Sequence, residues 1–479
     1  MVPCVDEGQR NDGGEEDSLA LDQEAEIMKK MNFLSGFRPF VIVFSAGVLC
    51  GCGHGTPIPE GSLVIRNGTV IDGTGGQPIQ GGIVVVAGDR VVAVGDEEDF
   101  RMGPGYRVVD AGGGTIMPGF INSHIHHGAP ADTRHLFLSV GVTSICDLGS
   151  DISEMNEFLQ KSGTSGPAAR GFRGGPIVTA PGGYPDAAYG THINYEVASP
   201  EEARVGVRDM ADRGADLIKI ALDPGWNRES PRPVPDLETT RAIVEEAHKH
   251  GLLVRAHLIQ PPQMDLAIQA GVDVVEHLAM PSWPSREEEN RLIVGPDPVG
   301  LFFEIWAPDY QPKLEMMAAQ GTAMVPTVSA LLHDFYVAEN PTPREAWVVE
   351  VVLDIVRRFH EAGGVVGVAN DFNDRGSKER LPLLELEMLQ EAGLTAMDVI
   401  VAATRNNARV CGQEENLGTL EPGKLADIIV VDGDPLSDLV GSIQRVTHVV
   451  LDGELVIGSR PKSAMVGSGY SAGEEGTSR

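Results

Sequence analysis

Short apolar runs alternate with amphipathic stretches through the middle of the chain. Eight runs have the length and composition of buried strands, at 116–126, 143–148, 175–179, 217–222, 252–258, 272–278, 323–328 and 365–370. Apolar residues at helical spacing fill the gaps between them, as in 200–213, 237–250, 263–270 and 348–362. This alternation is typical of a parallel sheet, and eight such units predict an α/β fold with a (β/α)8 TIM barrel over residues 115–416.

A second set of strand-like runs, separated by glycine-rich turns, flanks that region on both sides. The runs lie at 63–72, 83–94 and 106–110 before it, and at 426–431 and 446–457 after it. Neither group alone has enough strands for a stable sheet domain. We therefore expect residues 62–114 and 417–460 to form one small β-sandwich domain from both chain ends.

The first residues do not read as part of either domain. Residues 1–27 contain nine acids, one arginine and little apolar periodicity, which predicts a disordered extension. Residues 28–52 combine a charged start with the ten-residue apolar run 40–49, which is too short to span a bilayer, and so predict a secretory signal. We expect translation to begin at Met28. Residues 53–61 read as a Gly/Pro linker, and 461–479 as a disordered tail.

The end of that signal has a recognisable form. Leu49-Cys50-Gly51-Cys52 resembles a bacterial lipobox, whose last cysteine is lipidated and becomes the new N-terminus. This resemblance predicts a lipid anchor at Cys52 and a location in the cell envelope or periplasm. An ordinary cleavage site, giving a secreted protein, or an uncleaved anchor are the alternatives, because Cys50 is unusual within a lipobox.

Composition restricts the partners. At 479 residues and 42% hydrophobic content, the chain is long enough for more than one structural unit. Its formal charge of -32 argues against nucleic acids and anionic membrane surfaces, because both attract lysine and arginine. Beyond residue 52 the cysteines are Cys146 and Cys411, and two thiols so far apart do not indicate a disulfide framework.

The first predicted barrel strand ends in Ser123-His124-Ile125-His126-His127. Side chains two apart on a strand share a face, so His124 and His126 point the same way and form a pair suited to a metal. For an isolated pair the alternative is one solvent-exposed and one core histidine. His127 has the opposite parity, which predicts a structural or solvated side chain.

Further polar residues end other predicted strands. They are Lys219 in the fourth, His257 in the fifth, Glu276-His277 in the sixth and Asn370-Asp371 in the eighth. Because the C-terminal strand ends of such a barrel form its catalytic rim, four histidines, a lysine and an aspartate are predicted to meet there. A cationic lysine would be costly to bury and would repel a metal. A carbamate formed from Lys219 and carbon dioxide removes both difficulties, because it is an anionic ligand that can bridge two metals about 3.5–4 Å apart.

With these motifs the chain resembles the amidohydrolase superfamily, in the branch of metal-dependent prolidases, other dipeptidases and imidazolonepropionase-like proteins. The resemblance covers about residues 62–458. Its stretches, in chain order, are Pro118-Gly119-Phe120-Ile121-Asn122-Ser123-His124-Ile125-His126, Gly141-Val142-Thr143-Ser144, Gly214-Ala215-Asp216-Leu217-Ile218-Lys219, Ala256-His257, Glu276-His277, Val325-Pro326-Thr327, Asn370-Asp371 and Leu417-Gly418-Thr419-Leu420-Glu421-Pro422-Gly423-Lys424-Leu425-Ala426-Asp427. Ordered motifs on so many strands are far more specific than any one of them.

The resemblance implies a ligand set and a mechanism. His124, His126 and Asp371 hold one divalent metal, His257 and His277 hold the other, and carboxylated Lys219 and a hydroxide bridge the pair. Zinc suits imidazole and carboxylate ligands, although manganese or cobalt can occupy such sites. The metals lower the pKa of the bridging water and polarise the scissile carbonyl. Asp371 is expected to take the proton from the attacking water and pass it to the leaving amine.

Two positions depart from the pattern of relatives. Ala369-Asn370 precedes the strand-eight aspartate where Gly-Thr is usual, which changes a supporting contact but not the ligand. Arg255 shares a strand face with His257 where a small residue is commoner. It either forms an ion pair below the site or reaches the substrate.

Substrate contacts are expected from the loops that follow the predicted strands. The loop after the third strand carries Tyr184, Tyr189 and His192, any of which can hydrogen bond a substrate carboxylate or the carbonyl oxygen in the transition state. Arg228, after the fourth strand, has a similar position. Ordinary loop packing is the alternative for all four residues.

The sequence therefore predicts a hydrolase that cleaves an amide bond with a metal-bridging hydroxide. A dipeptide, such as Xaa-Pro, or an N-acyl amino acid is the expected substrate, and a homo-oligomer is compatible with it. Hydrolysis of a cyclic amide or imidazolone is the first alternative. A deaminase and a non-catalytic binding lipoprotein rank below it, because deaminating relatives need no bridging lysine and a binding protein needs no complete ligand set.

Overall fold

The computed structural model describes residues 55–102, 105–185, 193–225, 230–280, 284–372 and 379–458, with the backbone of 462–463. The predicted extension at 1–27 and the predicted signal at 28–52 lie outside these residues. So do most of the predicted tail, three of the four expected substrate contacts and the lipidation site at Cys52. Within the described residues, no helix combines the length and the apolar character needed to cross a bilayer.

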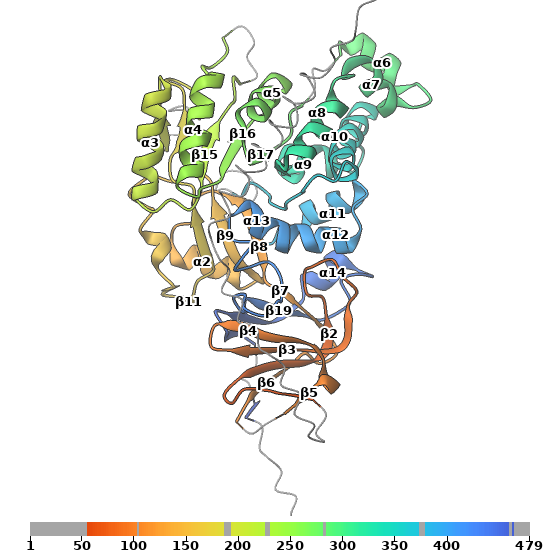
Figure 1. The fold of residues 1–479 in the computed structure, drawn as a ribbon. Coiled ribbons are helices and arrows are strands. Elements are labelled where there is room, and N and C mark those ends of the chain that lie inside the picture. Colours follow the sequence, from red (N-terminus) through yellow and green to blue (C-terminus); the bar gives the residue numbers. More distant parts are fainter. Residues whose placement is uncertain are drawn as a thin grey trace, which may run out of the picture. The chain divides into compact units, whose positions relative to one another are not determined.

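Two parallel sheets form the middle of the chain (Figure 1). The first has the order β12-β9-β8, with β8 (Phe120–Ile125), β9 (Val142–Asp147) and β12 (Arg170–Arg173). The second has the order β14-β13-β15-β16-β17-β18, with β13 (Ile177–Thr179), β14 (Asn194–Glu196), β15 (Ile218–Ala221), β16 (Val254–His257), β17 (Val274–Glu276) and β18 (Ala323–Val325). The predicted mixed α/β fold with parallel strands is confirmed.

The predicted strand at 365–370 is replaced by isolated backbone bridges. Val366 pairs with Met324, and Phe372 pairs with Ile125, both in parallel orientation. Between these bridges the side chain of Asn407 takes over backbone pairing: its Oδ1 accepts from the Val368 amide at 2.9 Å and its Nδ2 donates to the Val368 carbonyl at 2.7 Å. A continuous backbone ladder is therefore interrupted here, although the segment still lies between the two sheets.

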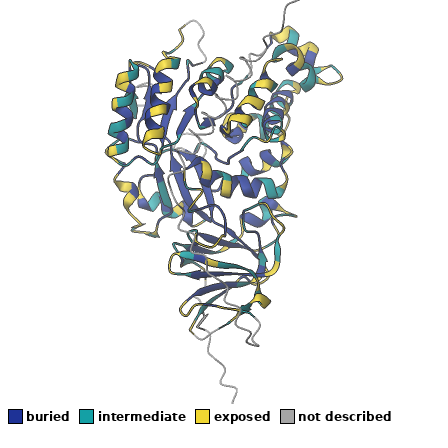
Figure 2. Ribbon diagram, in the orientation of Figure 1, coloured by how far each residue is buried: buried dark blue, intermediate teal, exposed yellow. Residues whose placement is uncertain are grey.

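Helices follow the strands of the parallel sheets. They are α2 (Ala131–Leu138), α3 (Pro200–Asp212), α4 (Leu237–Lys249), α5 (Pro261–Ala270), α6 (Arg286–Ile293), α7 (Pro298–Trp306), α8 (Tyr310–Gln320), α9 (Val328–Tyr336), α10 (Pro343–Glu361), α11 (Leu383–Glu391), α12 (Ala396–Val401), α13 (Asn407–Val410) and α14 (Leu439–Ile443). Capping side chains set several helix starts: Ser199 begins α3, and Thr342 and Glu345 form a capping box at α10. Figure 2 shows buried strands and helices with one buried and one exposed face, as amphipathic patterns require.

A nine-stranded sheet combines strands from both flanks of this region. Its main order is β21-β20-β19-β7-β2-β3-β4, with β6 paired to β2 and β22 paired to β6. The strands are β2 (Leu63–Val70), β3 (Ile79–Ala87), β4 (Arg90–Asp96), β6 (Arg107–Asp110), β7 (Thr115–Pro118), β19 (Ile428–Val431), β20 (Val446–Leu451), β21 (Glu454–Ile457) and β22 (Lys462–Ser463). Smaller pairs are β1 (Thr56–Pro57) with β5 (Phe100–Arg101), and β10 (Ser162–Gly163) with β11 (Gly166–Pro167).

The expected single strand at 116–126 is in fact two strands in different sheets. β7 pairs with β19 and β2 in the nine-stranded sheet, whereas β8 pairs with β9 in a parallel sheet. The change occurs at Gly119, where a Cβ atom would lie 2.2 Å from Oγ1 of Thr143. Only glycine allows this close approach, so the chain passes from one sheet to the next without a loop.

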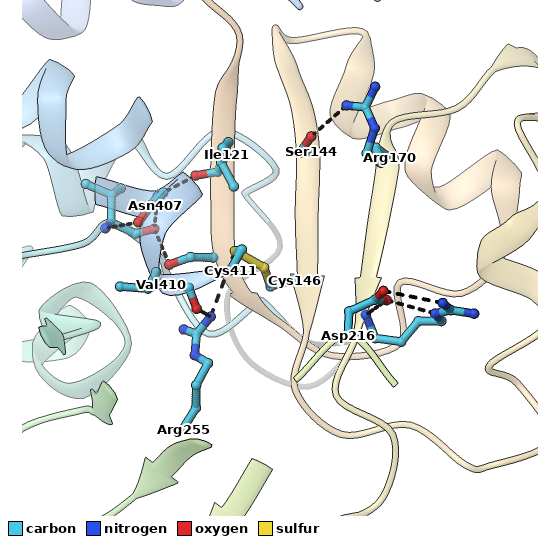
Figure 3. Close-up of a disulfide and its surroundings, with 12 residues drawn as sticks. Ile121, Ser144, Cys146, Arg170, Asp216, Arg255, Asn407, Val410 and Cys411 are labelled. Atoms are coloured by element: carbon cyan, nitrogen blue, oxygen red, sulfur yellow. Dashed lines mark hydrogen bonds and ion pairs between the residues drawn. A yellow bond between two sulfur atoms is a disulfide. The ribbon is translucent and has the colours of Figure 1, made fainter. Parts of the chain in front are cut away.

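Cys146 of β9 and Cys411, directly after α13, form a disulfide across a sequence separation of 265 residues (Figure 3). The sequence, which did not indicate a disulfide framework, gave no sign of this single bond. Both cysteines are fully buried, in an apolar cluster with Ile121, Leu217 and Val325. Tertiary packing brings them to a Cα–Cα distance of 6.5 Å, which their separation in the sequence hides.

Removing this bond should destabilise the protein. Because the bond closes a loop of 265 residues, the chain-entropy model gives a loss of about 5 kcal/mol in the free energy of unfolding for Cys146→Ser/Cys411→Ser. Thermal unfolding followed by circular dichroism measures the effect. Reducing agent should lower the Tm of the wild type but not that of the double variant. Equal Tm values for the two proteins without reductant would contradict the prediction.

Candidate metal centre

His124, His126 and Asp371 lie together at the C-terminal ends of their segments. β8 carries His124 and ends just before His126, while Asp371 follows the segment that bridges the two parallel sheets. Oδ1 of Asp371 is 3.5 Å from Nε2 of His124 and 3.2 Å from Nε2 of His126. One potential ligand atom from each residue lies within 4.8 Å of the others, as metal binding requires.

His257 and His277 lie beside this group. His257 is the last residue of β16, and His277 directly follows β17. The ring centroids are 4.6 Å apart for His257 and His277, and 5.1 Å apart for His277 and His124. The four predicted histidines therefore form one continuous cluster.

Lys219, on β15, is buried beneath the same cluster. Its side chain is 1% exposed, and among the described residues Nζ has no hydrogen-bond partner. Burial lowers the lysine pKa to about 8, with opposing electrostatic contributions from Glu276 and Arg255. Because its pKa lies close to neutral pH and Nζ has no described partner, this amine is suited to react with carbon dioxide. The residues present thus fit metal ions held by imidazoles, a carboxylate and a modified lysine.

Three of the four histidines have an outer partner that fixes the ring. Nδ1 of His124 donates to Oε2 of Glu276 at 2.7 Å, and Nε2 of His257 donates to Oδ2 of Asp223 at 3.2 Å. Nδ1 of His277 is 2.7 Å from Oγ1 of Thr327. These contacts leave Nε2 of His124, Nδ1 of His257 and Nε2 of His277 as the nitrogens for a metal. Such outer hydrogen bonds are a regular feature of metal-binding histidines.

Electrostatics favour the ligating forms of three of the imidazoles and of the aspartate. Burial lowers the pKa values of His124 and His257, and it lowers the pKa of His277 to about 3, so these rings are neutral near pH 7. Burial opposes the charge on Asp371, but the surrounding imidazoles outweigh it and hold the aspartate pKa below its usual range. Burial also lowers the pKa of His126, yet its hydrogen bond to Asp371 wins and the net shift is upward.

Comparison of the chain with known protein families identifies the family to which it belongs. A model of the amidohydrolase family matches residues 115–456, which is most of the chain and includes every residue of the cluster. The chain belongs to the amidohydrolase family.

Similar proteins in this family have diverse names. This amidohydrolase is 24% identical over 420 residues to 5-methylthioadenosine/S-adenosylhomocysteine deaminase of Symbiobacterium thermophilum, covering 78% of this chain and 85% of that protein. It is 24% identical over 451 residues to ochratoxinase of Aspergillus niger, covering 82% and 86%. A crystal structure described as a Xaa-Pro dipeptidase with bound methionine in the active site has a TM-score of 0.63 and 24% identity, and the match covers 83% of this chain and 100% of that one. That structural likeness supports the fold.

Tyr184 is the expected substrate contact that lies within the described residues. Its ring stacks on His257, with centroids 4.5 Å apart and an interplanar angle of 18°. The guanidinium carbon of Arg232 lies 5.7 Å from the centre of the Tyr184 ring. Tyr189, His192 and Arg228 lie outside the described residues.

The sequence prediction gave no role in the site to several residues of this amidohydrolase. Asp223 and Thr327 each contact a histidine, as described above. Asp147, at the end of β9, accepts from the Gly128 amide at 2.7 Å and favours the charged form of His126. Asp147 ends a strand, and Asp223 and Thr327 each follow one. This position at the C-terminal end of a strand could have identified all three from the sequence. No sequence pattern indicated that Gly149 belongs to the site. A Cβ atom at this position would lie 3.1 Å from Nδ1 of His126.

The two departures from the family pattern have structural roles. Arg255 forms a buried ion pair with Glu276, with Nε 2.5 Å from Oε1, so of the two expected roles the structure shows the ion pair. Oδ1 of Asn370 accepts from Nδ2 of Asn122 at 3.0 Å, and its own amide donates to the Glu379 carbonyl at 2.7 Å. Asn370 therefore ties the Asp371 segment to β8 and to the chain that follows it.

The backbone around the site is strained at four of the described positions, one of which is His127, with a φ angle of 59°. His277, Thr327 and Asp371 have φ angles of 65°, 46° and 48°, in the left-handed region that non-glycine residues rarely occupy. Such conformations persist where surrounding contacts impose them, and they concentrate at functional sites. Glu385 supplies one such contact, because its carboxylate accepts the Val328 and Ser329 amides at 3.1 and 2.7 Å, just after Thr327.

Loss of the Thr327 hydroxyl should weaken metal binding. In Thr327→Val the His277 ring loses its Nδ1 partner, so we expect zinc affinity to fall about 10-fold, as found for outer partners of metal ligands. Competition with a chromogenic chelator measures it. Thr322→Val is the matched control, since its hydroxyl contacts only the Val272 carbonyl at the opposite end of β18. Equal affinities in both variants would contradict the prediction.

Proposed function

We propose that this chain is a binuclear metal-dependent amidohydrolase that cleaves an amide bond in a dipeptide or an N-acyl amino acid. The observation that carries the proposal is Lys219: a fully buried amine without a described hydrogen-bond partner, beside four histidines and an aspartate. A mononuclear site has no need of such a lysine. A site for two ions needs an anionic ligand between them, and a carbamate supplies one.

The proposed ligand assignment follows the grouping of the side chains. His124, His126 and Asp371 bind one ion, and His257 and His277 bind the other. Lys219 lies between the groups after its amine adds to carbon dioxide, forming an N–C bond and releasing one proton. Zinc is the proposed metal because imidazole and carboxylate oxygen suit it.

Asp371 is the proposed proton carrier. Bound divalent ions supply Lewis acidity and lower the pKa of a coordinated water. The surrounding imidazoles hold the pKa of Asp371 below its usual range, so its carboxylate carries no proton near pH 7 and has a site for the proton of the attacking water. It then returns this proton to the amine that leaves as the amide bond breaks. The left-handed backbone at Asp371 holds its carboxylate against His124 and His126, where this transfer occurs.

Tyr184 and Arg232 support a substrate with a free carboxylate. The tyrosine ring covers His257, and the arginine lies over that ring, so a phenol and a cation border the proposed second metal position. A carboxylate on the amino-acid half of the substrate would find both a hydrogen-bond donor and a positive charge there. A similar protein of known structure, described as a Xaa-Pro dipeptidase with bound methionine, agrees with an amino-acid site.

Hydrolysis of a cyclic amide or imidazolone is the second candidate, and deamination the third. The similarity to a deaminase over 78% of the chain favours testing deamination. Metal content separates the classes: two ions per chain support the binuclear hydrolase, one ion supports a deaminase-like site, and none supports a binding protein.

The proposed architecture completes this picture. We propose that the two parallel sheets close into the (β/α)8 barrel through the bridging segment around residues 366–372, and that the nine-stranded sheet is the small β-sandwich of both ends. We also propose a cell-envelope location with a lipid anchor at Cys52. The buried disulfide supports that location, because such bonds persist in oxidising compartments. Intact-mass measurement of the membrane-extracted protein tests the anchor.

Lys219→Ala should abolish both metal retention and turnover. Without the amine no carbamate forms, so the ions lose the ligand between them. Elemental analysis after gel filtration measures metal content, and amine release from a dipeptide measures turnover. Lys313→Ala, which removes a lysine paired with Asp265 on the helical surface, is the control and should behave as wild type. Full activity in Lys219→Ala would rule out the bridging role.

Arg232→Met should raise KM for substrates with a free carboxylate about 10-fold, which corresponds to about 1.4 kcal/mol. The same variant should leave KM unchanged for the matching carboxamides, because only the charge interaction is lost. Arg241→Met is the control, since its guanidinium contacts a backbone carbonyl on α5. An equal rise for both substrate types would contradict a carboxylate role.

The broadest test is a screen of the zinc-loaded mature protein against dipeptides, N-acyl amino acids, cyclic amides and nucleosides. Hydrolysis confined to the first two groups supports the proposal. Release of ammonia from a nucleoside without amide cleavage would replace it with deamination.

A further inference from the structure

Arg255 is an arginine in the interior of the protein whose contacts point toward the candidate metal centre. It is fully buried, on β16, two residues before His257. Its Nε donates to Oε1 of Glu276 at 2.5 Å. Glu276 is also fully buried and uses its other oxygen, Oε2, to accept from Nδ1 of His124 at 2.7 Å. The two carboxylate oxygens thus connect one arginine and one histidine.

The far end of Arg255 is held by the chain around the disulfide. Nη1 donates to the Val410 carbonyl at 3.3 Å and lies 3.9 Å from Sγ of Cys411. Val410 ends α13, and the bond from Cys411 to Cys146 fixes this point to β9 (Figure 3). β9 belongs to a different sheet from the strands β16 and β17 that carry His257 and Glu276. The guanidinium is therefore held between a covalently anchored backbone and Glu276.

A buried ion pair of this kind is poor evidence of a purely stabilising role. Removing two charges from water costs several kcal/mol per ion, and well-packed apolar side chains of similar volume are often as stable. The ion pair does, however, position the Glu276 carboxylate that accepts a hydrogen bond from His124. A carboxylate facing Nδ1 of His124 fixes the proton on that nitrogen and directs Nε2 toward Asp371, 3.5 Å away.

We propose that Arg255 is a positioning residue for the metal centre: held at the disulfide-anchored end of α13, it fixes Glu276, and Glu276 orients His124 for metal binding. The inference rests on the proposed function only in taking His124 as a metal ligand. It goes beyond it by assigning a role to an arginine and a glutamate that contact neither metal nor substrate.

Charge explains why arginine suits this position. Glu276 interacts with Lys219, the site of the proposed carbamate, so a second anionic group without a counter-ion would be disfavoured there. Arg255 provides the positive charge and a donor in a planar, rigid group. A neutral residue without this donor would leave Glu276 free to turn away from His124, and that change would release the ring.

Zinc affinity of the metal-free, full-length protein tests the proposal without relying on turnover. Arg255→Met should bind zinc 10- to 100-fold more weakly than wild type in competition with a chromogenic chelator. The cobalt-substituted variant should also show an altered visible absorption spectrum, because the geometry at His124 changes. Wild-type affinity and spectrum in Arg255→Met would overturn the proposal.

Arg134→Met is the matched control. Arg134 is a second fully buried arginine, but among the described residues its hydrogen-bond acceptors are backbone carbonyls, of Ala129, Glu157, Gln160 and Ala169. Its replacement should lower thermal stability and leave zinc affinity and the cobalt spectrum unchanged. Equal losses of affinity in the two arginine variants would reduce Arg255 to a general packing role and overturn the proposal.

Glu276→Gln tests the same proposal if Arg255→Met fails to fold. Glutamine has nearly the same shape, but its single carbonyl oxygen can accept from Arg255 or from His124, not from both, and its NH2 opposes the remaining donor. We expect at least a 10-fold loss of zinc affinity, and wild-type affinity would overturn the proposal. Failure of the proposed function looks different: wild-type protein that binds zinc through this network, yet hydrolyses no amide, would refute amide hydrolysis while leaving the role of Arg255 intact.

Discussion

A buried lysine amine needs compensation, and this requirement explains most of the site. Lys219 lies beneath four imidazoles with no described hydrogen-bond partner at Nζ. In an interior of low polarity an uncompensated ammonium is strongly disfavoured, and the same environment lowers its pKa to about 8. The buried environment thus disfavours the cationic form of this amine. The proposed carbamate would turn this amine into an anionic ligand for ions held by the surrounding imidazoles.

The outer contacts show how the protein holds such a centre. Glu276, Asp223 and Thr327 come from different segments, and each fixes one ring nitrogen of a different histidine. Their own positions are fixed in turn, Glu276 by Arg255 and Thr327 by the helix start that Glu385 caps. The ligands are therefore oriented before a metal arrives, which lowers the ordering that binding must impose.

Family membership and substrate preference depend on different parts of the chain. The family model spans 115–456, and relatives at 24% identity have names as different as a deaminase and an ochratoxinase. One fold supports many reactions because the strand ends hold the ligands while the loops beyond them contact the substrate. In this chain Tyr184 and Arg232 are loop residues that lie near the proposed second metal position.

Local patterns in the sequence were enough to predict most of the parallel strands, several of the helices between them, and six polar residues at the ends of the expected strands. Their information is local: burial on both faces sets a strand's composition, and parity two along a strand places His124 and His126 on one side. Tertiary structure alone decided what depends on contacts between distant segments. It split the expected strand at Gly119, placed Asn407 between two strands, joined Cys146 to Cys411, and gave Arg255 its partners. These features depend on which distant segments pack against each other, and the periodicity of residues along the chain does not specify such packing.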